Sequence, residues 1–294
     1  MRAGLVLAAC LLLAALPAWA QDELTGTLKK LRDSGTITLG YRESSLPFSY
    51  VTAGGTPIGY ALDLCREVAD DAAAELGVPE LRIALKPVTP EDRIQKLVSG
   101  DIDLECGSTT NNVERQQQVA FSPITFVAGT KLLVPRASPV QSYRDLAGKT
   151  VVVTVGTTNE AAVKKLSDRQ HLGIRFVTTP DHAQSYALLA SGGADAFATD
   201  DVLLYGFVAT AKNGAAFHVV GDYLSYEPYG LMYRRDDPAF ATVVQASFAR
   251  MADAGILRDD YNRWFTKRLP TGETLNLPMS PQLAEIFRLL GQPD

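Results

Sequence analysis

Two short stretches of this sequence repeat one another: LVSGDID at residues 97–103 and LASGGAD at residues 189–195. Both follow the pattern L-x-S-G-x-x-D, in which a glycine ends a helix and the chain turns into a strand. Each copy lies in a region where helical and extended patterns alternate. A repeat of this kind, in two separate α/β regions, predicts two similar lobes.

Helices and strands alternate on both sides of the two copies. Apolar and β-branched runs predict strands over 36–39, 82–88, 102–106, 151–154, 174–178 and 196–199. The helical spacing of apolar residues predicts helices over 63–76, 91–98, 160–166, 184–189, 240–254, 261–265 and 281–290. Strands that alternate with helices of this length are typical of mostly parallel sheets flanked by helices. The predicted fold class is therefore α/β.

The first twenty residues have the pattern of an export signal. A positive start at Arg2, an apolar run and the small residues Ala18 and Ala20 predict cleavage after Ala20. Lipidation at Cys10 is the alternative, which we favour less because only about four apolar residues precede that cysteine. The apolar run is shorter than the roughly 20 residues that span a bilayer, and we expect no transmembrane anchor.

The composition and the absence of several motifs exclude some classes of function. The chain has 28 basic and 33 acidic residues and a formal net charge of −5, which disfavours nucleic-acid binding. It contains no G-x-S-x-G, C-x-x-C or H-x-x-x-H pattern, so we expect neither a metal nor another cofactor. The segment GKT at 148–150 lacks the preceding glycine of a phosphate-binding loop, and we interpret it as a turn.

Two further features have structural interpretations. Cys65 and Cys106 remain after cleavage of the signal, and a disulfide bond between them is one alternative. We favour two buried free thiols, because the sequence does not place the two residues within bonding distance. We interpret Asp101 and Asp103 as solvated residues beside a turn.

Polar clusters follow the carboxyl ends of the predicted strands, where open parallel sheets form ligand crevices. Asp200 in one cluster suits an ammonium group, and Thr157 and Thr158 begin a predicted helix whose N–H groups suit an anion. Each arginine taken alone is better explained by a salt bridge, but their shared placement favours a site for a zwitterion with extra negative charge. The arginines, whose planar donors suit carboxylates, are Arg42, Arg93 and Arg115.

Three segments resemble the periplasmic solute-binding proteins of polar amino-acid ABC transporters, and most of all their glutamate/aspartate-binding branch. They are ECGSTTNNVERQ at 105–116, YRESSLPFSY at 41–50 and VVVTVGTTNE at 151–160. The resemblance extends from about residue 24 to the end of the chain. It implies two α/β lobes that close on a ligand around a two-segment hinge. The implied division is a signal peptide at 1–20, a first lobe at 21–127 plus 227–294, and a second lobe at 128–226.

The resemblance also implies how the ligand is held. Arg115 would bind the α-carboxylate with Thr157 or Thr158. The chain departs from the branch at Pro90, where the branch has a hydroxyl residue, so the preference among glutamate, aspartate and glutamine stays open. The residues implied to bind the α-ammonium group are Asp200, Ser108 and Thr110. Those implied to surround the side-chain carboxylate are Arg42, Arg93 and His182.

The expected function is that of a monomeric periplasmic receptor, not an enzyme. It would deliver L-glutamate or L-aspartate to the membrane subunits of an ABC permease without a cofactor. The alternative is an exported cyclohexadienyl or arogenate dehydratase on the same fold, with His182 or Glu43 as general acid. The zwitterion-binding set of Arg115, Asp200 and Thr157 disfavours that alternative. The lack of a transmembrane segment disfavours a third interpretation, a sensing domain of a signalling receptor.

Overall fold

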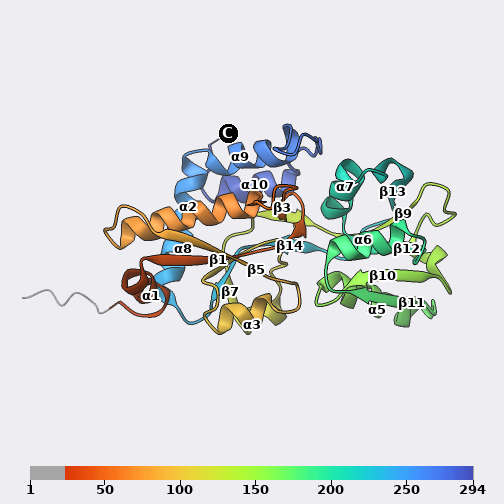
Figure 1. Cartoon of the computed structure of the whole chain (residues 1–294), viewed down its shortest axis with the longest axis horizontal. Helices are drawn as coiled ribbons and strands as arrows, with labels where there is room; N and C mark the ends of the chain where they lie inside the picture. Colours follow the sequence, from red (N-terminus) through yellow and green to blue (C-terminus); the bar gives the residue numbers. More distant parts are fainter. Residues whose placement is uncertain (1–23, 294) are drawn as a thin grey trace, which may run out of the picture.

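The computed structural model describes residues 24–293, so the predicted signal sequence and Cys10 lie outside the described part of the chain. Two five-stranded sheets form the centres of two lobes, which lie side by side along the long axis of the molecule (Figure 1). Helices flank both sheets. The predicted α/β fold class with two lobes is confirmed, and each predicted strand is present within two residues of its predicted ends.

The first sheet combines parallel and antiparallel pairs. Its strands, in sheet order, are β5 (Arg82–Pro87), β1 (Thr36–Tyr41), β6 (Leu104–Cys106), β15 (Met232–Arg234) and β7 (Val119–Phe121). β5, β1 and β6 are parallel, whereas β15 is antiparallel to β6 and β7. A small sheet beside it contains β2 (Ser44–Ser45), β3 (Ser49–Val51) and β4 (Pro57–Ile58). The helices of this lobe are α1 (Gly26–Ser34), α2 (Tyr60–Glu75), α3 (Arg93–Val98), α4 (Val113–Gln116), α8 (Pro238–Asp253), α9 (Ile256–Tyr261), the π-helical η3 (Asn262–Thr266) and α10 (Pro281–Leu289).

The second sheet has the same plan. Its strands, in sheet order, are β11 (Arg175–Thr179), β10 (Thr150–Thr154), β12 (Ala196–Asp200), β9 (Thr130–Pro135) and β13 (Phe217–Val220). β11, β10 and β12 are parallel, and β9 is antiparallel to β12 and β13. The helices of this lobe are η1 (Tyr143–Leu146), α5 (Thr158–Gln170), α6 (His182–Ala190), α7 (Asp201–Thr210) and η2 (Gly214–Ala216).

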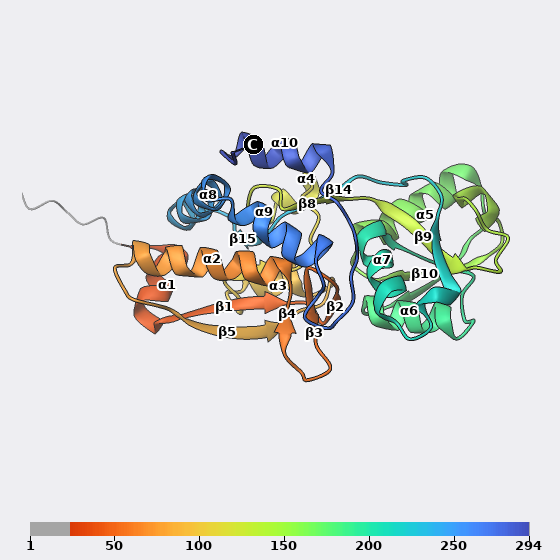
Figure 2. The same ribbon diagram turned by 90° about the horizontal axis from the view of Figure 1, so that it is seen from above.

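The chain passes between the lobes along two short strands. β8 (Phe126–Ala128) and β14 (Glu227–Tyr229) pair antiparallel with each other between the two sheets (Figure 2). β8 leads into β9 of the second sheet, and β14 leads into β15 of the first. Each crossing therefore continues as the antiparallel strand in the fourth position of the sheet that it enters.

Aromatic side chains hold this two-stranded link against the first lobe. Phe126 of β8 and Tyr229 of β14 both pack edge-on against Phe48, with ring centroids 5.0 Å apart in each pair. Phe126 also stacks on Phe265 at 4.9 Å. Buried aromatic pairs contribute area and a geometric preference for one arrangement. The first lobe therefore fixes the position from which β14 presents its side chains.

The repeated aspartates have the same structural role in both lobes. Asp103 N donates to Thr38 O at 2.7 Å, and Thr38 N donates to Asp103 Oδ2 at 2.9 Å. In the second lobe, Asp195 N donates to Thr150 O and Thr150 N donates to Asp195 Oδ2, both at 2.8 Å. The repeat therefore marks the residue that clamps the central strand to its neighbour in each sheet.

The interpretation of Asp103 as a solvated turn residue is wrong. Its side chain is fully buried and accepts from Lys30 Nζ and Arg234 Nη2, both at 2.8 Å. Asp101 is different, because its side chain is 53% exposed and pairs with Lys86 Nζ at 3.0 Å. The turn after α3 therefore directs one carboxylate into the lobe and the other toward solvent.

The preference for free thiols is also wrong. Cys65 and Cys106 form a disulfide bond, with an S–S distance of 2.13 Å and a Cα–Cα distance of 6.2 Å. Cys65 lies on α2, which packs on the sheet beside β6, and Cys106 is the last residue of β6. The bond therefore ties α2 to a strand whose end is followed by a polar cluster.

Replacing Asp103 by alanine is expected to lower the free energy of unfolding by about 3–5 kcal/mol, because it leaves two cations without their buried carboxylate. Asp101→Ala is the matched control, and it should change stability by less than about 0.5 kcal/mol. Urea denaturation of both variants measures the difference. Equal losses in the two variants would contradict the buried-clamp role of Asp103.

Candidate functional site

Eight of the nine predicted ligand-binding residues line one cavity at the junction of the lobes. The cavity has a volume of about 210 Å³. Its lining residues are Arg42, Arg93, Ser108, Thr110, Thr157, Thr158, Asn159, His182 and Asp200. The ninth predicted residue, Arg115, is adjacent, since its Nη1 donates to Thr110 O at 2.9 Å. Each lobe supplies part of the lining, and Asn159 is an addition that the sequence analysis missed.

The positive side of the cavity is formed by buried guanidinium groups. Arg42 and Arg93 are only 1% and 2% exposed. Nη2 of Arg42 and Nε of Arg93 have no hydrogen-bond partner among the described residues. Neither arginine, nor Arg115, forms an ion pair within the described part of the chain. Because a buried charge without a partner is unfavourable, this side of the cavity suits an anionic group.

Burial also changes the acidity of these groups. Desolvation, with the nearby charge of Arg93, lowers the pKa of Arg42 and of Arg115 to about 9. Desolvation followed by the charges of Arg42 and Arg93 lowers the pKa of His182 well below its usual value. His182 is therefore a neutral imidazole at pH 7, and its Nδ1 lies 2.8 Å from Thr154 Oγ1.

The buried carboxylate of Glu105 is linked to Arg93 through the hydroxyl group of Thr109. Arg93 Nη1 donates to Thr109 Oγ1 at 2.5 Å, and Thr109 Oγ1 donates to Glu105 Oε2 at 2.7 Å. A Cβ atom at Gly107 would clash with the Glu105 carboxylate and with the side chain of Arg42. The sequence analysis assigned no role to Glu105, although it begins the quoted segment at 105–116.

The negative side of the cavity is centred on Asp200. Its Oδ1 accepts from Asn159 Nδ2 at 2.8 Å and its Oδ2 accepts from Tyr229 OH at 2.5 Å. Burial, with the nearby charge of Glu227, raises the pKa of Asp200 to about 7. Glu227 and Tyr229 both lie on β14, and the sequence analysis found neither of them.

The first turn of α5 offers backbone donors to the same cavity. Thr157 is its N-cap, accepting from Glu160 N at 3.1 Å and donating to Thr154 O at 2.7 Å. Its hydroxyl proton is thereby committed to the backbone. The N–H groups at the start of a helix have no intrahelical partner, so those of Thr158 and Asn159 form an anion site.

The two lobes touch over the cavity. Gly156, in the turn before α5, has a φ of +74°, and a Cβ atom there would lie 2.9 Å from Glu91 Cα. Arg115 Nη2 donates across the same junction to Gly156 O at 3.4 Å. The two lobes therefore contact each other at the turn of Gly156, which leaves no room for a side chain.

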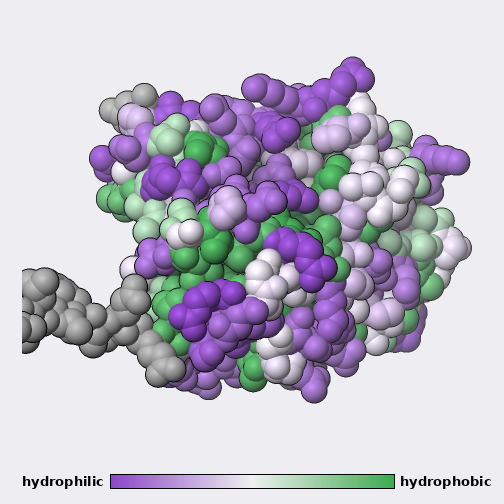
Figure 3. Space-filling view, turned by 60° about the vertical axis from the view of Figure 1, so that its left-hand side comes forward, coloured by the Kyte–Doolittle hydropathy of each residue, from purple (hydrophilic) through white to green (hydrophobic). Residues whose placement is uncertain are grey.

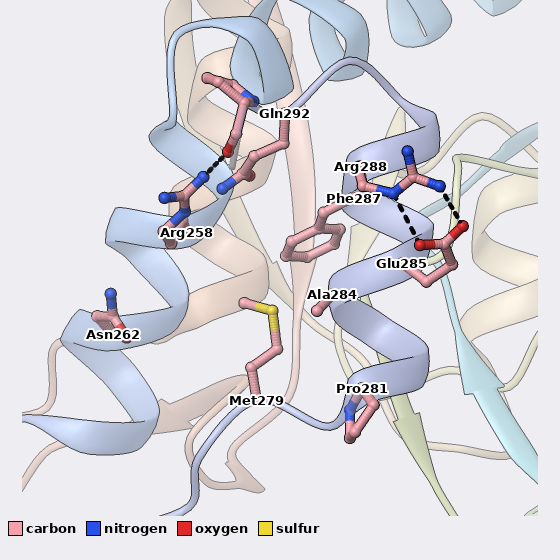
Figure 4. Close-up of a pocket in the computed structure, with 10 residues that line it drawn as sticks. Arg258, Asn262, Met279, Pro281, Ala284, Glu285, Phe287, Arg288 and Gln292 are labelled. Atoms are coloured by element: carbon pink, nitrogen blue, oxygen red, sulfur yellow. Dashed lines mark hydrogen bonds and ion pairs between the residues drawn. The ribbon is translucent and has the colours of Figure 1, made fainter.

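A larger hollow of about 1020 Å³ lies elsewhere, between α9 and α10 (Figure 4). Phe287 and Met279 point toward it, and the ion pair between Glu285 and Arg288 lies on the side of α10 that faces away from α9 (Figure 4). It contains none of the predicted site residues. Residues 24–293 contain no group of three or more side chains suited to a metal ion.

Residues 37–267 match the bacterial extracellular solute-binding proteins, family 3. The chain belongs to this family. It is 44% identical over 268 residues to the L-glutamate/L-aspartate-binding protein of Pseudomonas aeruginosa, covering 90% of this chain and 89% of that one. It is 39% identical over 263 residues to the glutamate/aspartate import solute-binding protein of Salmonella typhimurium, covering 89% and 87%. The expected resemblance is confirmed, and both relatives are binding proteins rather than enzymes.

A solved structure of the same architecture concerns the alternative interpretation. An ancestral amino acid-binding protein, a precursor of cyclohexadienyl dehydratase, matches with a TM-score of 0.71 and 28% identity, covering 82% of this chain and all of that one. The candidate general acids of a dehydratase fit poorly here. Glu43 lines a different hollow, and the lowered pKa of His182 leaves its imidazole neutral at pH 7, without the acidic imidazolium proton that a general acid transfers. We therefore set the dehydratase aside.

Proposed function

We propose that this chain is a monomeric periplasmic receptor that binds L-glutamate or L-aspartate between its lobes and delivers it to an ABC permease. The observation that carries the proposal is the pair of buried guanidinium groups of Arg42 and Arg93 that line the cavity, since Arg42 Nη2 and Arg93 Nε have no hydrogen-bond partner among the described residues. The names of the two relatives support the same ligand class. None of the helices within residues 24–293 is long and apolar enough to cross a bilayer. The face shown in Figure 3 is largely hydrophilic, with hydrophobic residues gathered in smaller areas.

The proposed ligand has one charged group for each part of the cavity. Arg115 and the N-terminus of α5 bind its α-carboxylate. Asp200, with Ser108 and Thr110, binds its α-ammonium group. The side-chain carboxylate lies between the remaining cationic and neutral donors, which are Arg42, Arg93 and His182.

Pro90 bears on selectivity. It lies three residues before Arg93 and has no hydroxyl group, so it donates no hydrogen bond to a side-chain carboxylate. The side chain is then held by guanidinium and imidazole groups. A charged ligand is favoured over an amide, because charge-assisted hydrogen bonds are the stronger ones.

Ligand binding and lobe closure are coupled in this proposal. The first lobe (21–127 and 227–294) supplies the arginines, and the second lobe (128–226) supplies the helix N-terminus, His182 and Asp200. A ligand that bridges both sets stabilises the closed arrangement by differential contact. The permease would then recognise the closed form.

Isothermal titration of the ligand-stripped protein against the amino acids tests the proposal. Arg42→Ala is expected to weaken the binding of glutamate and of aspartate by about 1.5–3 kcal/mol, which is a roughly ten- to hundredfold loss of affinity. The affinity for glutamine should fall less in this variant, because the glutamine side chain carries no charge. Arg82→Ala, which removes an exposed arginine of the same lobe, is the control and should leave affinity unchanged. Equal losses for all three ligands would exclude a side-chain role for Arg42, and binding of only basic or apolar amino acids would refute the acidic specificity.

The raised pKa of Asp200 predicts proton release on binding below neutral pH. The ligand-free carboxyl has a pKa of about 7, and it must be ionised to pair with the ligand ammonium group. Affinity should therefore fall as the pH drops below 7, by at most about tenfold per pH unit. Titration at pH 6 in two buffers of different ionisation enthalpy should show release of up to one proton, and little exchange at about pH 8, between the Asp200 pKa of about 7 and the arginine pKa values of about 9. Asp200→Asn should abolish the release, whereas an equal release in that variant would assign the proton to another group.

Gly156 tests the closed arrangement. Gly156→Ala introduces a Cβ against the backbone of Glu91, whereas Gly148→Ala meets no atom within 4 Å at a similar φ of +66°. Both substitutions cost about 1–2 kcal/mol of stability through the left-handed backbone. Only Gly156→Ala should also weaken ligand binding, by at least roughly tenfold, since overpacking typically costs 1–3 kcal/mol. Parallel titrations and thermal melts separate the two effects, and equal affinities would contradict contact of the lobes at this turn.

A further inference from the structure

We infer that Glu227 is a positioning residue for recognition of the ligand's α-ammonium group. It turns the hydroxyl groups of Thr110 and Thr158 so that both present lone pairs to the cavity. The inference rests on the proposed function only in requiring a ligand with an α-ammonium group. It concerns a residue of the crossing strand β14 that does not itself line the cavity.

Glu227 joins the two lobes at the base of the cavity. Its side chain is 2% exposed, and its Oε2 accepts from Thr110 Oγ1 and from Thr158 Oγ1, both at 2.6 Å. Thr110 follows β6 of the first lobe, and Thr158 begins α5 of the second. A carboxylate oxygen only accepts hydrogen bonds, so both threonines are the donors in these contacts.

A count of hydroxyl protons then fixes what the threonines offer a ligand. Each hydroxyl has one proton, and in both cases that proton points to Glu227. The two oxygens lie 3.2 Å apart and both line the cavity, where only their lone pairs remain available. The carboxylate of Asp200 and these two hydroxyls provide three acceptors for the three donors of an ammonium group, in addition to the Ser108 hydroxyl in the same lining. A ligand carboxylate placed there would meet only acceptors.

A second chain of donors leads from Glu227 to Asp200. Ser225 Oγ donates to Glu227 Oε1 at 2.5 Å, so the 2.7 Å contact between Thr130 and Ser225 has Thr130 as its donor. The amide Nδ2 of Asn159 then donates to Thr130 Oγ1 at 2.7 Å and to Asp200 Oδ1 at 2.8 Å. The carboxylates of Glu227 and Asp200 only accept hydrogen bonds, and they thereby determine which atom is the donor in each contact of this network. The network therefore fixes the polarity of this side of the cavity before any ligand enters.

This assignment changes the expected role of Thr158. Its hydroxyl has no proton left for an α-carboxylate, and that of Thr157 is committed to Thr154 O. Backbone N–H groups of α5 and Arg115 remain as the donors to the α-carboxylate. Glu227 thus decides which end of an amino acid lies at Asp200 and which lies at the helix.

Glutamate and glutarate distinguish this role from a purely structural one. Glutarate keeps both carboxylates of glutamate and lacks the amino group. In Glu227→Gln an amide N–H can donate to one threonine and release its hydroxyl proton toward the cavity. We compare the ligands by the ratio of the dissociation constant of glutarate to that of glutamate. Titration calorimetry should show this ratio falling at least tenfold in the variant, because the binding of glutamate is weakened more than that of glutarate. A variant that weakens both ligands by the same factor, or weakens neither, would overturn the inference.

Substitutions of Thr158 keep the test available where Glu227→Gln is poorly folded by its thermal melt. Thr158→Val removes the hydroxyl at nearly constant volume and should also lower the ratio, whereas Thr158→Ser keeps the hydroxyl and should preserve it. An unchanged ratio in Thr158→Val would overturn the inference. Glu285→Gln, which alters an exposed glutamate on α10, is the control and should behave as the unchanged protein.

The outcome is separable from that of the proposed function. If the unchanged protein binds neither glutamate nor aspartate, the acidic-ligand proposal fails. The same ratio is then measured for whichever amino acid binds and for its analogue without the amino group, since the α-ammonium group is common to all. If no amino acid binds, both the proposed function and the role of Glu227 are refuted.

Discussion

Buried charge without an ion pair is the constraint on which the rest of this structure depends. Arg42 and Arg93 bring positive charge to the lining of the cavity and Asp200 brings negative charge to it, while the buried Glu227 lies beside two of its threonines. Hydroxyl and amide donors stabilise the carboxylates of Asp200 and Glu227, whereas Arg42 Nη2 and Arg93 Nε have no hydrogen-bond partner among the described residues. Because an isolated buried charge is unfavourable, a ligand with matching charges would stabilise the closed arrangement that we propose.

The fold supplies this separation of charge through two sheets of the same strand order. The polar residues follow the carboxyl ends of parallel strands, so each lobe presents one edge to the cavity. The crossing strand β14 then places Glu227 and Tyr229 behind residues of both lobes. In the proposed mechanism closure and recognition involve the same strand, since Glu227 accepts a hydrogen bond from one hydroxyl of each lobe. A change in the angle between the lobes would therefore also disturb the acceptors that we propose for the ligand's ammonium group.

The local pattern of the sequence predicted the parallel strands but missed every antiparallel one, including the six-residue β9. β7, β8, β14 and β15 have three residues each, too few to show a period. The helix α7, with the sequence DVLLYGFVAT, was missed because its residues are apolar on most sides and show no amphipathic spacing. Asp103 was interpreted as a solvated residue from the sequence, because no local pattern places Lys30 and Arg234 beside it.

By itself, the sequence determined the fold class and which polar residues follow strand ends, because both depend on neighbours within a few positions. It named Arg42, Arg93 and Asp200 before their surroundings were known. Only the tertiary structure decided the bond between Cys65 and Cys106, and the contacts of Glu227 with Thr110 and Thr158. These partners lie far apart in the chain, and they meet through the packing of α2 on β6 and the pairing of β14 with β8. No local periodicity encodes such pairings, because their free energy comes from burial and hydrogen bonds that exist only in the assembled molecule.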